Sequence, residues 1–114
     1  MESRAVHRFI GSSPRKMRLI IDLIRGMSVD KAIEVLHFST KHASKDAEKV
    51  LRSAVANLMN SDDSTRFEPN ELYVKETYVN SGPIIKRIQP APMGRAFRVR
   101  KRSCHLTIVV ASKD

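Results

Sequence analysis

One stretch of this chain, Ile84–Arg102, concentrates side chains that are suited to binding phosphate. It contains seven Lys or Arg residues and no Asp or Glu, and it holds most of the net charge of +9 carried by the 114 residues. On a strand, Arg98, Arg100 and Arg102 would line one face about 6.6 Å apart, close to the spacing of successive phosphates. A charged edge that only resists aggregation is the alternative. Because the cations are not balanced by acids, we favour polyanion binding. The seven are Lys86, Arg87, Arg95, Arg98, Arg100, Lys101 and Arg102.

A second group of cations follows a predicted helix start. Ser13-Pro14 is typical of a helix N-terminus, because the hydroxyl caps the first turn and proline lacks an N–H that would go unpaired. Arg15, Lys16 and Arg18 come next, where the helix dipole is already positive and a phosphate would offset their repulsion. Alternatively, these side chains extend into water and Arg18 pairs with Asp22 one turn later. We favour a phosphate.

Residues that commonly do covalent or metal chemistry form no recognisable motif. The chain has four histidines and one cysteine, without the spacing of a metal site. Cys104 and His105 are adjacent, but neighbouring side chains on a strand face opposite ways and cannot pair directly. A buried structural cysteine is the simpler interpretation. The four glycines stand too far apart for a phosphate loop. We therefore expect no enzyme activity, no metal and no cofactor.

Composition and charge narrow the class of protein. The length fits one domain, and 41% apolar with 29% charged residues indicates a globular chain. A pI near 10.2 points to nucleic acid, or less often to an anionic membrane surface. The basic stretch is not an amphipathic helix with apolar anchors, and no apolar run reaches the length of a membrane span. A thin basic arm suits the clefts of a large folded RNA better than a rigid duplex. The N-terminal segment lacks a secretory signal, so we expect the cytoplasm.

Three helices are predicted before the basic stretch. In the first, apolar residues follow helical spacing, and Leu19 and Leu23 widen the stripe. Glycine at a helix end allows the positive φ of the last turn, and Ser or Thr caps the start. The helices are bounded by Ser13 and Gly26, by Ser28 and Phe38, and by Thr40 and about Asn60.

Extended structure is predicted on both sides of the helices. Ser3–Ile10 reads as a short strand, and the polar Ser61–Asn70 as a loop. From Glu71 two strands, joined by a Pro-Ala-Pro-Met-Gly turn, form a hairpin whose near halves complete a sheet with the N-terminal strand. The fold class is α+β, with three helices packed on a small antiparallel sheet and a long protruding β-hairpin. We expect a single domain, 1–114, with a globular part at about 1–82 and 103–114 and a basic arm at about 83–102. An isolated arm of this kind is marginal in water and needs a polyanion.

Seven stretches form a pattern that covers nearly the whole chain. The most specific are SPRK…DLIRG and P-x-MGRA-x-R-x-RKR. The seven are Ser13–Gly26 (SPRKMRLIIDLIRG), Ala32–Phe38, Val50–Asn57 (VLRSAVAN), Leu72–Val79 (LYVKETYV), Gly82–Arg87, Pro92–Arg102 and His105–Val110. With these stretches the chain resembles the bacterial type of the universal family of large-subunit ribosomal protein twenty-two.

The resemblance implies an architectural role, with no reaction and no cofactor. In that family a compact α+β domain lies on the outer surface of the large ribosomal subunit near the exit of the nascent-chain tunnel. A long hairpin runs through ribosomal RNA, and its tip forms part of the tunnel wall. The implied partners are 23S rRNA, several domains of which are bridged during assembly, neighbouring large-subunit proteins and the nascent polypeptide. A membrane is not among them.

The resemblance and the charge pattern together assign two sets of residues. The tunnel-lining tip comprises Gln89, Pro90, Ala91, Pro92, Met93, Gly94 and Arg95. The rRNA-binding set comprises Arg4, Arg8, Arg15, Lys16, Arg18, Lys86, Arg87, Arg95, Arg98, Arg100, Lys101 and Arg102. The tip reads QPAPMGR, whereas family members often have more basic residues before the Gly-Arg pair. A free-standing nucleic-acid-binding protein is the alternative function.

Overall fold

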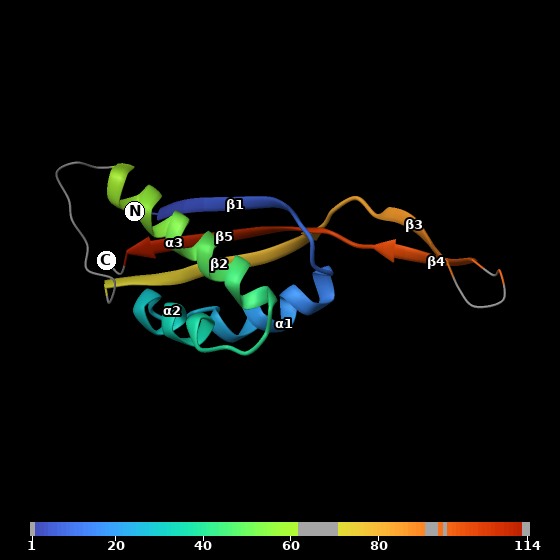
Figure 1. Cartoon of the computed structure of the whole chain (residues 1–114). Coiled ribbons are helices and arrows are strands. Elements are labelled where there is room, and N and C mark those ends of the chain that lie inside the picture. Colours follow the sequence, from blue (N-terminus) through green and yellow to red (C-terminus); the bar gives the residue numbers. More distant parts are fainter. Residues whose placement is uncertain (1, 62–70, 91–93, 95, 113–114) are drawn as a thin grey trace.

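The structure is a computed structural model that describes residues 2–61, 71–90, 94 and 96–112. Within these residues three helices and five strands follow one another, and they confirm the predicted α+β class (Figure 1). The elements are β1 (Glu2–Ile10), α1 (Pro14–Ile24), α2 (Val29–His37), α3 (Ala43–Ser61), β2 (Leu72–Ser81), β3 (Ile85–Pro90), β4 (Ala96–Lys101) and β5 (Cys104–Ser112).

The larger sheet has three antiparallel strands in the order β1-β5-β2, so β5 lies in the centre. The N-terminal strand is therefore the third member of the sheet, as predicted. Alternate residues of β5 are fully buried on the side that faces the helices, because side chains alternate across a strand. These residues are Cys104, Leu106, Ile108 and Val110.

The three helices lie together against the larger sheet (Figure 1), α3 across β1 and β5 and α1 along β2. The buried stripe of α1 consists of Met17, Ile20, Ile21 and Ile24. Leu19 and Leu23 do not widen it, since both side chains are 56% exposed. That part of the prediction is wrong, because a helix packed on one side buries only a narrow stripe.

Of the six predicted helix boundaries, five match the structure and the start of the third helix is wrong. Ser28 and Phe38 flank α2, although the Ser28 side chain makes no capping hydrogen bond. The Lys16 N–H donates to Ser13 Oγ at 3.3 Å, and Gly26 ends the first helix with a φ of 83°. The third helix begins at Ala43 rather than after Thr40. The Lys41 N–H donates to Ser39 Oγ at 3.3 Å, which uses these residues in a turn before the helix. Of the predicted loop, Ser61 ends α3 and 62–70 lie outside the described residues.

Strands β3 and β4 form a second, two-stranded antiparallel sheet that projects beyond the helices (Figure 1). This is the predicted protruding hairpin, and the molecule is 65 Å long in its longest dimension. We call the junction of the two sheets, Gly82, Pro83 and Ser103, the neck. There the Gly82 N–H donates to the Ser103 carbonyl at 2.9 Å, and Ser103 Oγ donates to the Pro83 carbonyl at 2.7 Å. Pro83 lacks an N–H, which ends the regular ladder.

Candidate nucleic-acid interface

Of the three cations predicted at the start of α1, two are exposed to solvent and the third contacts the backbone of the sheet. Arg15 and Lys16 are exposed in the first turn, which contains no acidic residue. Arg18 instead turns toward β2, where its Nη2 donates to the Val79 carbonyl at 3.0 Å. The alternative pairing of Arg18 with Asp22 is wrong, because Asp22 pairs with Arg25 at 2.9 Å. A backbone contact of this kind fixes α1 against the sheet, so any contact of Arg18 with RNA would be secondary.

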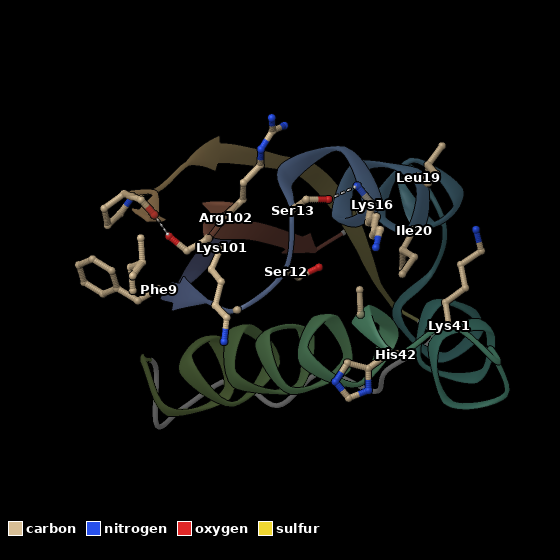
Figure 2. Close-up of a pocket in the computed structure, with 15 residues that line it drawn as sticks. Phe9, Ser12, Ser13, Lys16, Leu19, Ile20, Lys41, His42, Lys101 and Arg102 are labelled. Atoms are coloured by element: carbon tan, nitrogen blue, oxygen red, sulfur yellow. Dashed lines mark hydrogen bonds between the residues drawn. The ribbon is translucent and has the colours of Figure 1, made fainter. Parts of the chain in front are cut away.

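A groove of about 1160 Å³ separates the start of α1 and the turn before α3 from the base of the arm (Figure 2). Four cationic side chains line it: Lys16, Lys41, Lys101 and Arg102. Its apolar lining includes Phe9, Leu19 and Ile85, and none of the described residues that line it is acidic. We call it the arm-base groove.

The cations of the arm-base groove lack acidic partners in the part of the chain that the structure describes. Among the described residues, no carboxylate forms an ion pair with any of the four. Cations elsewhere do find such partners: Arg52 pairs with Glu48 at 2.8 Å, and Lys75 with Glu2 at 2.6 Å. Like charges that line one groove without a counter-charge repel one another, so an anion in the groove lowers the electrostatic free energy.

Phe9 lies at one end of this groove in an unusual conformation. Its φ is +59°, in the left-handed region, and its side chain is 66% exposed. The Phe9 N–H donates to His105 Nδ1 at 3.0 Å, and the two rings meet edge to face with centroids 5.0 Å apart. The register between β1 and β5 shifts between His7 and Ile10, which returns Ile10 to the core and turns Phe9 outward.

The remaining predicted rRNA-binding residues are spread over two other parts of the molecule. Arg4 and Arg8 are exposed on β1, and Arg4 lies on the sheet face opposite the helices, next to Val109. On the arm, Lys86 is exposed, and the backbone ladder pairs it with Arg100. Arg87 is paired with Val99 and Arg98 with Ile88. The strand ends at Lys101, so the regular alternation covers Arg98 and Arg100, and Arg102 lies in the connection to β5.

The predicted tunnel-lining tip is described only in part. Gln89 and Pro90 form the last backbone pairs of the arm, with Phe97 and Ala96. Gly94 has a φ of +73°, which glycine adopts without strain. Ala91, Pro92, Met93 and Arg95 lie outside the described residues.

Cys104 is a structural cysteine, as predicted. It is fully buried on the helical side of β5, whereas His105 lies on the other side, where it accepts the Phe9 N–H. Burial raises the pKa of the Cys104 thiol, and the negative charge of Asp46 raises it further, so the reactive thiolate is disfavoured. The described residues hold no group of three His, Cys, Asp or Glu that could bind a metal. No described helix is long and apolar enough to cross a membrane.

The sequence-based set missed two groove residues, Phe9 and Lys41. Phe9 lies within the predicted strand Ser3–Ile10, and only the Gly11-Ser12-Ser13 run that follows indicates that the strand ends irregularly. Lys41 carries no sequence signal, because it comes near Lys16 through the packing of α3 against α1. The structure brings Lys16, Lys41, Lys101 and Arg102 together although they come from three separate segments.

Comparison with known proteins agrees with the arrangement of helices, sheet and arm. A protein family described as ribosomal protein L22p/L17e matches residues 5–111. "Large ribosomal subunit protein uL22" of Chlorobium phaeobacteroides is 53% identical over 96% of this chain and 94% of its own length. The protein of the same name from Chlorobaculum tepidum is 53% identical over 96% and 92%, and that from Clostridium acetobutylicum 41% over the full length of both chains. The family consists of structural ribosomal proteins rather than enzymes. These matches show that the chain belongs to the ribosomal protein L22p/L17e family, in its bacterial type.

Proposed function

We propose that this chain is a structural component of the large ribosomal subunit that binds 23S rRNA and holds several of its domains together during assembly. Membership of a ribosomal protein family supports the ribosome as the site of action, in the cytoplasm. The observation that carries the proposal is the projecting β3–β4 arm, whose sequence is rich in Lys and Arg and free of acidic residues. Such an arm can enter a cleft of folded RNA that a globular surface cannot reach.

The mechanism is neutralisation of phosphates that belong to separate RNA segments. Exposed cations lie on three parts of the molecule: on β1 with Arg4 and Arg8, around the arm-base groove, and on the arm at Lys86. Each neutralised phosphate releases counterions and lowers the repulsion between RNA segments. Contacts with phosphates fix position without reading sequence, which suits a protein that places RNA domains relative to one another.

The arm would become ordered as it binds. Ile84, Ile85 and Ile88 are at least half exposed, with Ile88 at 73%, so the described part of the arm buries little apolar surface. A two-stranded ribbon without a core is marginal in water. In this proposal the arm reaches its stable form between RNA surfaces, with the tip Gln89–Arg95 at the wall of the polypeptide exit tunnel. There it would meet the nascent polypeptide, and the globular part would meet neighbouring large-subunit proteins.

Sedimentation of the tagged protein from a cell lysate tests this proposal. After a high-salt wash, we expect about one copy per large subunit to remain bound, because a buried arm dissociates slowly. Release to the top of the gradient would instead indicate a free-standing nucleic-acid-binding protein.

Deletion of Ile84–Arg100 gives an independent check. The remaining chain should still unfold cooperatively, because the core lies in α1–α3 and the larger sheet. Its binding to 23S rRNA should be weaker and less dependent on salt. Loss of cooperative unfolding would show that the arm is not a separate extension.

A further inference from the structure

We propose that the arm-base groove binds an unpaired segment of RNA, with one base stacked on Phe9 and neighbouring phosphates held by Lys16 and Lys41. The proposal rests on the proposed function, since it takes RNA as the polyanion. It adds a site, a chemical class of ligand and a stacking residue that the charge pattern does not reveal.

The dimensions and charge of the groove suit a short stretch of nucleic-acid chain. Its volume of about 1160 Å³ slightly exceeds the range of roughly 300–1,000 Å³ that is typical of small-molecule sites. In Figure 2, Phe9 lies at one end, Lys16 and Lys41 lie toward the other, and Lys101 and Arg102 lie between them. An aromatic ring at one end and ammonium groups at the other match the alternation of base and phosphate along a strand.

The conformation of Phe9 indicates that its exposure is functional. A bulky residue with φ of +59° is strained, and such strain persists only where the surrounding structure imposes it. Here the hydrogen bond from the Phe9 N–H to His105 Nδ1 and the edge-to-face contact with the His105 ring hold it. The register shift returns Ile10 to the core, but it leaves the Phe9 ring itself mostly exposed. A ligand that covers the ring accounts for that exposure.

Stacking selects an unpaired base over a duplex. In an RNA helix the base faces are covered by their neighbours, so a protein reaches mainly phosphates and 2′-hydroxyls. A single strand offers base faces that stack on aromatic side chains, and this contact tolerates any sequence. The groove therefore recognises single-stranded character rather than a particular sequence.

Fluorescence anisotropy with two RNA probes tests the proposal on the full chain. One probe is a ten-nucleotide oligouridine, and the other is a blunt RNA duplex of ten base pairs. We expect Phe9→Ala to weaken binding of the single strand about 5- to 150-fold, as loss of one stacked base does, with duplex binding within about twofold of wild type. Phe9→Trp should retain the affinity. The matched control is Phe38→Ala, because Phe38 is 79% exposed at the C-terminal end of α2 and does not line the groove.

A second variant separates stacking from folding. Phe9→Gly removes the ring and adopts a positive φ without strain, so it should keep the thermal midpoint and lose single-strand affinity as Phe9→Ala does. If Phe9→Ala and Phe9→Gly both bind oligouridine as tightly as wild type, the stacking proposal is wrong. It is equally wrong if both probes lose affinity to the same extent.

The phosphate part of the proposal has its own readout. Replacing Lys16 and Lys41 together by alanine should lower the slope of log affinity against log salt by about 1.4 for oligouridine, since each contact contributes about 0.7. Lys31→Ala, an exposed position on α2 outside the groove, should leave the slope unchanged. An unchanged slope in the double variant would overturn the assignment of the two lysines.

Measuring how wild-type protein binds full-length 23S rRNA distinguishes failure of this proposal from failure of the proposed function. If wild type binds 23S rRNA tightly and the Phe9 variants bind oligouridine normally, only the groove proposal fails. If wild type prefers neither 23S rRNA nor oligouridine over bulk duplex DNA, the proposed function fails with it.

Discussion

Replacing Gly82 by alanine should disturb the neck, because the added methyl group has almost no room. A Cβ at this position would lie 2.5 Å from Ser103 Oγ, 3.2 Å from the Ser103 carbonyl carbon and 3.3 Å from His105 Cε1. The hydroxyl can rotate away only by giving up its 2.7 Å hydrogen bond to the Pro83 carbonyl. The carbonyl carbon belongs to the backbone, so it moves only if the end of the ladder moves.

Three effects set the size of the change in the free energy of unfolding. Loss of the Ser103–Pro83 hydrogen bond costs about 0.5–1.5 kcal/mol. Displacement of packed atoms by an extra methyl group costs about 1–3 kcal/mol. Alanine restricts the unfolded chain more than glycine does, and this effect offsets about 0.4–1 kcal/mol of the lost stability. We therefore expect Gly82→Ala to destabilise the protein by about 1–3 kcal/mol.

Urea unfolding of a double-mutant cycle measures this effect. Ser103→Ala alone should cost about 0.5–1.5 kcal/mol, because only the hydrogen bond is lost. In that background Gly82→Ala should cost less than in wild type, since the nearest atom and the hydrogen bond are already gone. The double variant should be more stable than the two single effects predict, by about 1 kcal/mol.

The matched control for this cycle is Gly11→Ala. A Cβ on Gly11 would meet no atom within 4 Å, so the same substitution should be neutral or slightly stabilising there. Additivity within about 0.5 kcal/mol for Gly82 and Ser103 would refute the close contact across the neck.

Three further predictions concern the hydrophobic core, the Glu48–Arg52 ion pair and the buried cysteine. Leu106→Ala should lower the free energy of unfolding, measured in urea, by about 2–5 kcal/mol, because Leu106 is fully buried on β5. Ile88→Ala, on the exposed arm, should change it by no more than about 0.5 kcal/mol. Equal losses for the two variants would contradict the placement of the core. The hydrogen bond from Arg52 is the main cause that lowers the pKa of Glu48, so this ion pair stabilises the fold at neutral pH and is lost as pH falls through the lowered pKa. Glu48→Gln should therefore flatten the loss of stability that wild type shows below about pH 5, and an unchanged pH profile would count against it. Cys104 should react with iodoacetamide far more slowly in native buffer than in urea, because the thiol is buried and its pKa is raised; labelling of the native protein at the rate of a free thiol would rule out this environment.

The sequence predicts the elements well because the relevant signals are local. The hydroxyl and proline at Ser13-Pro14 and the glycine at Gly26 specify the ends of α1 through interactions within a few residues. Alternation along 104–112 likewise identifies the buried face of β5. The predicted start of α3 is wrong by two residues, because the turn at Ser39 and Lys41 depends on how the chain passes from α2 to α3.

The arm-base groove could be predicted only in part. The charge of Lys101 and Arg102 is visible in the sequence, whereas their position opposite Lys16 depends on the fold. The division of one expected hairpin into two sheets arises at the neck, from contacts between residues about twenty positions apart. The left-handed backbone of Phe9 also depends on a distant partner, His105, and no local pattern encodes it.

The central position of β5 has a consequence for the order of folding during synthesis. β5 is made after β1 and β2, yet both of these strands hydrogen-bond to it and not to each other. Until it emerges, the two earlier strands have unpaired edges and the helices lack the centre of the surface on which they pack. Such pairing across nearly the full length of the chain forms late, because the loop that it closes is long. Synthesis of β5 would thus act as a checkpoint, since a copy terminated before β5 presents the basic arm without a folded body to anchor it.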